Sequence, residues 1–424
     1  MGIQPSENSF CVSELGIMGY WGRKNMKQNK KTVSIVVALI FLVSFVGSYP
    51  QYQLSPIAYK IIPELQLSNA QFSAVFSAPM IPGILLSLAA GILSDKFGVK
   101  RCIGIAGVIS LVGVTLRIFW GTSSFTGLFV CMLLSGIVAS FNNANFGKIM
   151  GSWFPPEKVG MMVGIVSAGS TCAMALAMST TALLPSVKSA YTLAAVISAV
   201  ITVLFLVFMK EKTDEIPSGE KKEEKISLAD CVKVGLKNKF VWIVGLGLGL
   251  IFIPSICLSS FLPTALSEVR GIDAAAAGSV SSVIMFGNLF GGFLGPVIAA
   301  KVGKMKPVLI GFAVISAAGT AFGWLAPTGI PMILVLFLTG FACSTCVSLL
   351  LAAPVLLPGI GPVYAGTAGG LCATMELLIG VIVSSYIIAP AIGANYQLLY
   401  VTAGILGGVG ALLLTRLPEL YGRQ

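Results

Sequence analysis

Long apolar runs separated by short polar segments dominate the pattern along this chain. Each run is long enough to cross a bilayer, which takes roughly 20 mostly apolar residues in a helix. The runs are continuous rather than alternating at period two, so they indicate helices and not the strands of a membrane barrel. We expect an all-α polytopic membrane protein with twelve transmembrane helices. The runs are 33–54, 70–94, 102–120, 125–150, 158–184, 189–209, 240–266, 274–300, 307–325, 330–356, 363–390 and 396–415.

The runs divide into two sets of six, with one long polar segment between them. Segment 210–239 carries charges of both signs and a Pro-Ser-Gly break, which is typical of a solvated linker. The sequence therefore predicts five parts. They are an N-terminal tail (1–31), a first six-helix half (32–209), a linker (210–239), a second six-helix half (240–416) and a C-terminal tail (417–424).

An internal repeat supports this division. The stretch "GILSDKFGVKR" (91–101) follows the second run, and "PVIAAKVGKMK" (296–306) follows the eighth. The lysine, the glycine and the last basic residue keep their offsets, whereas Asp95 is replaced by Ala300. Two parallel repeats of six helices are a known transporter architecture, so we expect pseudo-symmetric halves.

Charge adds an orientation to this picture. The chain has 27 Lys and Arg against 16 Asp and Glu, a net charge of +11, yet only 10% of its residues are charged and its mean hydropathy is +0.93. If both termini are cytoplasmic, all but five basic residues fall on the inner side; the exceptions are Lys60, Arg117, Lys148, Lys188 and Arg270. The positive-inside rule then predicts a multi-pass protein of the cytoplasmic (inner) membrane. The basic balance needs no nucleic-acid partner.

This chain lacks the residues that several classes of protein function require. Histidine is absent, there is no phosphate-binding GxxxxGK[ST] loop, and the nine cysteines lack the spacing of a disulfide framework. Cys343 and Cys346 form a CxxC, but it lies within an apolar run. We therefore expect no enzyme, no cofactor and no metal site.

The stretch "GILSDKFGVKR" resembles the loop signature of the major facilitator superfamily, with Gly91, Asp95, Gly98, Lys100 and Arg101 in the expected places. The resemblance implies a monomeric transporter whose signature holds the cytoplasmic gate closed. Physically, the two glycines allow close approach and a tight turn, and Asp95 faces a helix N-terminus or a basic partner. The alternative is a plain positive-inside loop.

A second stretch, "SWFPPEKVGMMVGIVSAG" (152–169), is similar to the nitrate/nitrite, cyanate and small organic anion porters of this superfamily. The chain departs from the nitrate porters where they carry membrane arginines, since the second and eighth runs contain no arginine and the eighth has only Asn288. This resemblance implies a small anion as substrate rather than nitrate in particular.

Polar residues at membrane depth are candidates for substrate binding or coupling. Asn142 and Asn145 share a helix face and either line the cavity or hydrogen-bond between helices. For Lys148 we favour snorkelling to the inner interface over substrate contact, and for Arg117 we expect snorkelling to the outer interface. Tyr49 and Tyr52 belong either to an aromatic belt or to the substrate path.

Glu376 is the most isolated of these residues, because its nearest charged neighbours in the sequence are Lys306 and Arg416. It lies about 14 residues into the eleventh run, roughly 21 Å along a helix and too deep to snorkel. An ionised carboxylate there is costly, so it must face the bundle. Three roles stay open: a proton site, a counter-ion for a cationic or zwitterionic substrate, or a neutral hydrogen-bonding acid.

Together these features predict a secondary active transporter. We expect it to move a small carboxylate-bearing or other small anionic metabolite across the cytoplasmic membrane by alternating access, with proton coupling. One alternative is a zwitterionic or cationic solute with Glu376 as counter-ion. An alternative of another class is a non-transporting membrane sensor, although the linker is too short for a signalling domain. The expected partners are the small-molecule substrate, protons and membrane lipid.

Overall fold

The computed structural model describes residues 30–154, 156–210 and 234–421, so most of the expected N-terminal tail and linker lies outside the described residues. For a few positions within these ranges, Asp95 among them, only the backbone is described. All regular secondary structure in these ranges is helical, and twelve segments are long and apolar enough to span a bilayer. The prediction of twelve membrane-spanning helices is confirmed.

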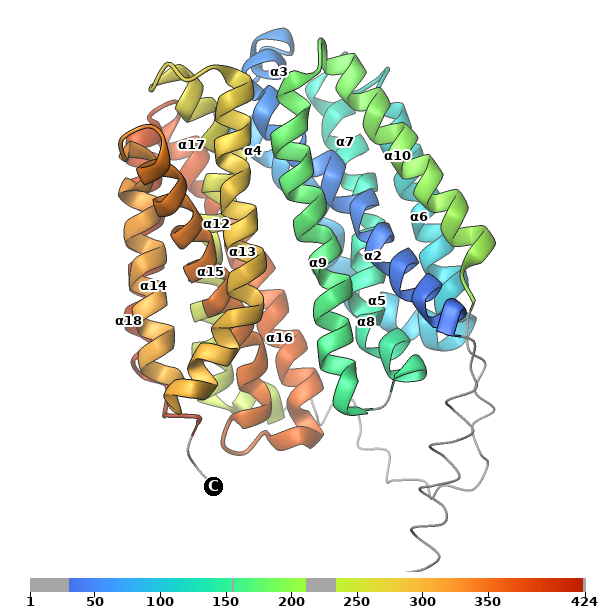
Figure 1. Ribbon diagram of the computed structural model, residues 1–424, viewed down its shortest axis with the longest axis vertical. Coiled ribbons are helices and arrows are strands. Elements are labelled where there is room, and N and C mark those ends of the chain that lie inside the picture. Colours follow the sequence, from blue (N-terminus) through green and yellow to red (C-terminus); the bar gives the residue numbers. More distant parts are fainter. Residues whose placement is uncertain (1–29, 155, 211–233, 422–424) are drawn as a thin grey trace, which may run out of the picture.

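The first half contains the helices that precede residue 210. They are α2 (Lys30–Tyr52), η1 (Ser55–Ile57), α3 (Ala58–Glu64), α4 (Asn69–Ser77), η2 (Ala78–Met80), α5 (Ile81–Phe97), α6 (Val99–Leu116), α7 (Phe125–Ser135), α8 (Ile137–Trp153), α9 (Pro156–Thr180), η3 (Thr181–Leu183) and α10 (Val187–Phe208). We call the end of the bundle where α2 begins the terminal end, because α18 of the second half also ends there, and the opposite end the distal end (Figure 1).

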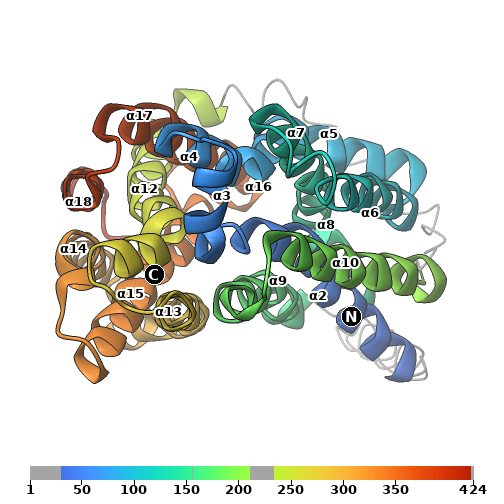
Figure 2. The same ribbon diagram turned by 90° about the horizontal axis from the view of Figure 1, so that it is seen from above.

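The second half contains the helices that follow residue 234. They are α12 (Lys239–Glu268), α13 (Ala274–Val302), α14 (Met305–Phe322), η4 (Gly323–Leu325), α15 (Ile330–Leu356), α16 (Gly361–Val381), η5 (Ile382–Ile388), α17 (Ala389–Ile392) and α18 (Tyr396–Leu414). Figure 2 shows α6–α10 on one side of the molecule and α12–α18 on the other, with α3 and α4 beside α12 and α17.

Several helices begin at a polar side chain that binds free backbone amides. Such caps matter in a membrane protein, because the first N–H groups of a helix have no partner within it. Ser68, Ser124, Ser186, Asp273 and Asn395 each accept a hydrogen bond from a backbone N–H two or three residues later. All five cap helices that start at the distal end. These caps end the spans cleanly on that side.

Three spans are interrupted near the distal end. The first is broken by η1, the second by η2, and the eleventh continues from α16 into the π-helical segment η5. Pro56 and Pro79 stand at the start of η1 and η2, where a residue without an N–H interrupts the helical hydrogen bonding. The first span was predicted to end at residue 54, but beyond η1 it continues to Glu64.

Buried apolar side chains form three clusters, and their distribution describes how the two halves meet. One cluster lies in the first half and includes Val36 and Met209, and another lies in the second half and includes Val241 and Leu417. The third contains residues from both halves, such as Phe72 of α4 and Phe261 of α12, and occupies the distal end. Among the described residues, the two halves therefore share a core at the distal end and have separate cores toward the terminal end.

Candidate functional site

Asn142 and Asn145 of α8 are both buried and both hydrogen-bond to neighbouring helices of the first half. Asn142 Nδ2 donates to Ser44 Oγ of α2 over 3.1 Å, and Asn145 Nδ2 donates to Ser94 Oγ of α5 over 2.9 Å. Of the two alternatives for this pair, these contacts support hydrogen bonding between helices. Asn142 Oδ1 has no hydrogen-bond partner among the described residues.

The exposed side of α8 carries small and polar residues. They are Asn143, Ala144, Gly147, Lys148 and Gly151, which repeat at the spacing of one helix face. We call this set the α8 polar stripe. The exposed faces of other spans carry large apolar residues such as Phe286, Phe290 and Leu294, whereas α8 exposes none. A lipid-facing surface is expected to be apolar, so the composition of the α8 polar stripe is typical of a water-filled path.

Lys148 is part of this stripe and lies toward the terminal end. Its Nζ donates to the backbone oxygen of Ser94 over 3.3 Å. Ser94 directly precedes Asp95, the acidic residue of the signature. The side chain is exposed, as expected for either snorkelling or substrate contact. Lys148 and Asn145 thus both reach Ser94, and together they connect α8 to the end of α5.

Glu376 lies on a buried stripe of α16. Cys372 and Ala368, one and two turns earlier, are completely buried in the second-half core, and Cys372 Sγ lies 3.6 Å from Val241 O of α12. Glu376 is 8% exposed, and the buried cluster that contains Cys372 also contains Cys343 of α15. The carboxylate therefore faces α12 and α15 within the second half. This agrees with the expectation that Glu376 faces the bundle.

The exposed side of α16 is different from the stripe that holds Glu376. Gly370 and Thr374 are exposed, and no atom of a described residue lies within 4 Å of a Cβ built at Gly370. One turn farther toward the distal end, Leu377 reaches Gly83 of α5, and Ser140 of α8 lies at the same place. Helices of both halves therefore meet at the level of Leu377, and the space next to Gly370 lies on the terminal side of this contact.

The tyrosines of the first span are buried at its distal end. Tyr49 OH lies 3.3 Å from Thr180 Oγ1 of α9, and the ring of Tyr52 stands edge-on to Phe76 with 5.3 Å between centroids. They contact protein rather than forming an exposed aromatic belt. Asn288 of α13 is half-buried, and its Nδ2 lies 3.8 Å from Met285 Sδ on the same helix.

The signature loop at the terminal end agrees only in part with the expectations from the sequence. Gly98 joins α5 to α6 with φ 89° and ψ 145°, a conformation that side-chain-bearing residues avoid, so the tight turn is confirmed. Gly303 at the matching place of the second half also has positive φ, 69°. The close approach expected at Gly91 is absent, because no described atom lies within 4 Å of a Cβ built there. Arg101 is exposed, Lys100 is half-buried, and the side chain of Asp95 lies outside the described residues.

Arg117 does not snorkel, and that expectation was wrong. It is completely buried at the distal end of α6, where its guanidinium carbon lies 4.0 Å from the centre of the Tyr191 ring. Its Nη1 donates to Pro50 O over 2.7 Å and its Nη2 to Gln53 Oε1 over 2.8 Å. Position alone suggested the interface, but the distal ends of α2, α7 and α10 close over this side chain.

Direct contacts between the halves gather at the distal end. Ser55 Oγ of η1 donates to Ser260 O of α12 over 2.8 Å, and Asn69 Nδ2 of α4 donates to Gly393 O over 3.1 Å. Phe72 packs on Phe261 with 5.7 Å between ring centres. Sequence reasoning did not identify Ser55, Asn69 or Phe72, because nothing in such a residue type indicates which helix it will meet.

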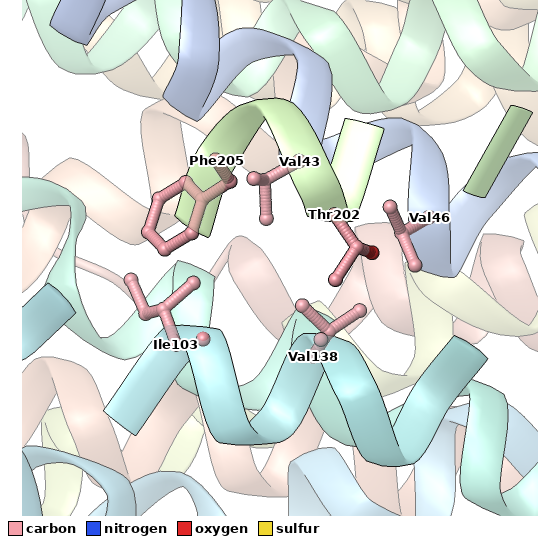
Figure 3. Close-up of a pocket in the computed structure, with 8 residues that line it drawn as sticks. Val43, Val46, Ile103, Val138, Thr202 and Phe205 are labelled. Carbon is pink, nitrogen blue, oxygen red and sulfur yellow. The ribbon is translucent and has the colours of Figure 1, made fainter. Parts of the chain in front are cut away.

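A small pocket lies within the first half, between α2, α6, α8 and α10 (Figure 3). Its lining is apolar apart from Thr202, and it includes Val43, Ile103 and Phe205. Thr202 Oγ1 is buried and has no hydrogen-bond partner in the part of the chain that the structure describes. The pocket is enclosed by the helices of one half and lacks convergent polar groups, so it does not resemble a substrate site.

Comparison with known proteins agrees with this geometry. A family model described as Major Facilitator Superfamily matches residues 33–384. The chain belongs to the Major Facilitator Superfamily. It is therefore a multi-pass membrane transporter and not an enzyme, and the resemblance seen in residues 91–101 is confirmed.

Three relatives of this superfamily member illustrate the likeness. The probable sulfoacetate transporter SauU of Cupriavidus necator is 22% identical over 426 residues, 91% of this chain and 94% of that protein. The hexuronate transporter of Bacillus subtilis is 27% identical over 184 residues, 42% of this chain and 43% of that protein. A bacterial homolog of the human lysosomal transporter Spinster, solved in an inward-facing and unoccupied conformation, superposes with a TM-score of 0.71 at 14% identity and covers 92% of this chain and 96% of that one.

Proposed function

We propose that this superfamily member transports a small carboxylate-bearing or other small anionic metabolite by alternating access, coupled to protons. The observation that carries the proposal is the kind of substrate in the names of its relatives. Sulfoacetate and hexuronate are both small organic anions with a carboxylate, and similarity to the sulfoacetate transporter extends over nearly the whole of both chains.

The α8 polar stripe supports an anionic substrate. Lys148 supplies a positive charge on an exposed face, and Gly147 and Gly151 leave room beside it. On the facing half, Gly370 and Thr374 form the exposed side of α16, and Figure 1 and Figure 2 both draw α8 and α16 on either side of the boundary between the halves. We assign the substrate path to the space between these two faces.

Glu376 supports proton coupling better than it supports a substrate counter-ion. Its carboxyl group shares a buried stripe with Ala368 and Cys372, whereas the exposed stripe of α16 carries Gly370 and Thr374. A substrate in the path would meet the exposed stripe first. A proton is small enough to reach a carboxyl group that does not line the path. Glu376, on the buried side of α16, is therefore able to bind a proton and to change the packing of α16 against α12 and α15.

The arrangement of cores supports alternating access. The halves share a buried core at the distal end, whereas the two other cores belong to one half each, so we infer that a path between α8 and α16 is accessible from the terminal end in this conformation. Exposed basic residues gather at that end, namely Lys96, Arg101, Lys301 and Lys304. By the positive-inside rule we assign the terminal end to the cytoplasm of the cell membrane, with both termini inside and a monomeric transporter.

Uptake by purified protein in liposomes tests the proposal. Sulfoacetate, glucuronate and the zwitterion glycine betaine are offered as labelled substrates, with and without an inward proton gradient. We expect gradient-stimulated uptake of at least one of the two carboxylates and none of betaine. If betaine alone is taken up and Glu376→Gln abolishes its binding, Glu376 is a counter-ion and the anion proposal is wrong.

A further inference from the structure

Arg117 is a buried cation whose contacts, among the described residues, are all with neutral groups. Besides Pro50 O and Gln53 Oε1 it contacts Met132 Sδ at 3.4 Å and the face of Tyr191. Burying a charge without a counter-ion is costly unless several hydrogen bonds compensate it. Arg117 also lies far from the α8 polar stripe. We therefore looked for a role of this buried charge outside the proposed substrate path.

The carbonyl that Arg117 binds is free because the first span breaks there. In a continuous helix Pro50 O would accept from Leu54 N, but Leu54 N instead donates to Gln51 O over 3.2 Å. The guanidinium takes the place of that missing amide. Its second nitrogen binds Gln53, whose own Nε2 donates to Ala190 O of α10 over 3.0 Å. Arg117 thus fixes the end of α2 to α6 and α10.

The segment directly after this break contacts the second half. All three residues of η1 are buried. Ser55 donates to Ser260 O of α12, and the Cβ of Pro56 lies 3.3 Å from the position of a Cβ at Gly278 of α13. We call Ser55, Pro56 and Ile57 the distal wedge. It lies only two residues beyond Gln53, so its position depends on how the end of α2 is held.

We propose that Arg117 is a positioning residue that keeps the distal end closed by holding the distal wedge against α12 and α13. This inference rests on the proposed alternation of access. Its planar, forked guanidinium binds two acceptors at fixed angles and stacks on Tyr191, whereas a lysine ammonium at the same place cannot do all three. Weakening the hydrogen bonds of Arg117 to the end of α2 loosens the contacts of the distal wedge with α12 and α13. The distal-closed conformation is then destabilised relative to the distal-open one.

Arg270 offers a matched control. It lies in the second half at the same end of the molecule and also donates to two backbone carbonyls, Trp324 O over 3.2 Å and Ala326 O over 3.1 Å. These partners belong to η4 and the residue after it, and none of them is in the distal wedge. Arg270 is half-buried, so Arg270→Lys disturbs a pair of arginine–carbonyl hydrogen bonds at the same end of the molecule without the proposed effect on closure.

Pulsed electron spin resonance measures the two conformations directly. Spin labels at Pro185→Cys and Thr328→Cys, both exposed at the distal end in opposite halves, report distal opening. Labels at Lys96→Cys and Lys304→Cys report the terminal end, in a background without the reactive native cysteines. In Arg117→Lys we expect the ratio of distal-open to distal-closed molecules to rise about tenfold, the change expected from losing one hydrogen bond to a charged group.

The outcomes separate this inference from the proposed function. Longer distal distances in Arg117→Lys, with shorter terminal ones and wild-type distances in Arg270→Lys, support the positioning role. Unchanged distances in both variants, with equal losses of thermal stability, overturn it and leave Arg117 as a fold-stabilising residue. The distances are measured without substrate, so a failure to transport any carboxylate contradicts the proposed function and not this inference.

Discussion

Leu377 of α16 reaches across the boundary between the halves to Gly83 of α5, with its Cδ1 3.3 Å from the position that a Cβ would occupy at Gly83. The glycine has no side chain, and this lets the two helices approach. Ser140 of α8 lies 3.9 Å from the same position. Three helices therefore meet at the distal limit of the proposed substrate path.

We expect Gly83→Val to slow transport by separating α5 from α16. Valine adds two methyl groups beyond a Cβ that is already tightly placed, and overpacking of this kind costs about 1–3 kcal/mol. Initial uptake rates in liposomes measure the effect. Leu377→Ala in the same chain removes the opposing group, so the double variant is expected to recover most of the rate. A double variant as slow as Gly83→Val alone would show that this contact is not the cause.

Lys148→Gln is expected to raise KM for an anionic substrate about tenfold or more. The estimate assumes the loss of one charge-assisted hydrogen bond of roughly 1.5–3 kcal/mol. Lys148→Arg keeps the charge and is expected to stay within a few-fold of the wild type. Asn145→Ala is the matched control, because it removes a neighbouring contact to Ser94 without changing charge. An equal KM in Lys148→Gln and the wild type argues that Lys148 only snorkels.

Glu376→Gln is expected to remove the pH dependence of uptake while exchange of labelled for unlabelled substrate continues. Glutamine is close in size and hydrogen-bonding ability to the protonated acid, so it imitates one state of a proton carrier and prevents the other. Uptake over a range of external pH and exchange at equal pH measure the two activities. Thr374→Val, on the exposed side of the same helix, is expected to change KM instead. A Gln variant with the wild-type pH profile rules out Glu376 as the proton site.

The signature glycines are expected to respond oppositely to alanine. Gly98→Ala must force a side chain into φ 89°, which costs about 1–3 kcal/mol and lowers the thermal midpoint of the purified protein. Gly91→Ala lies in the interior of α5 with open space around it, so the higher helix propensity of alanine makes it neutral or stabilising by up to about 1 kcal/mol. Equal losses at both positions contradict this assignment.

How much of the candidate site follows from sequence differs from residue to residue. The spacing of Asn142 and Asn145 correctly places them on one face, but that face packs on α2 and α5. The exposed face was also present in the sequence as Asn143, Gly147 and Gly151, four residues apart. Periodicity groups residues into faces without saying which face meets protein, because that depends on the rotation of the helix within the bundle.

Arg117 shows the same limit at the end of a span. Its distance along the chain from Arg101 predicts a place at the end of the span, and Arg117 directly follows α6. Its partners Gln53 and Tyr191 are more than sixty residues away in either direction. No local pattern brings them together, since the contact exists only after α2, α6 and α10 have packed.

The sequence by itself determined the number of membrane spans and the turn at Gly98. Each of these depends on local physics: the transfer of apolar segments into lipid, the need of every backbone amide for a partner, and the freedom of glycine at positive φ. Only the tertiary structure decided that Asn142 and Asn145 hold helices together, that Glu376 stands behind the exposed face of α16, and that Arg117 supports the broken first span. These relations arise from the joint packing of twelve helices, in which the orientation of each is set by all its neighbours rather than by its own residues.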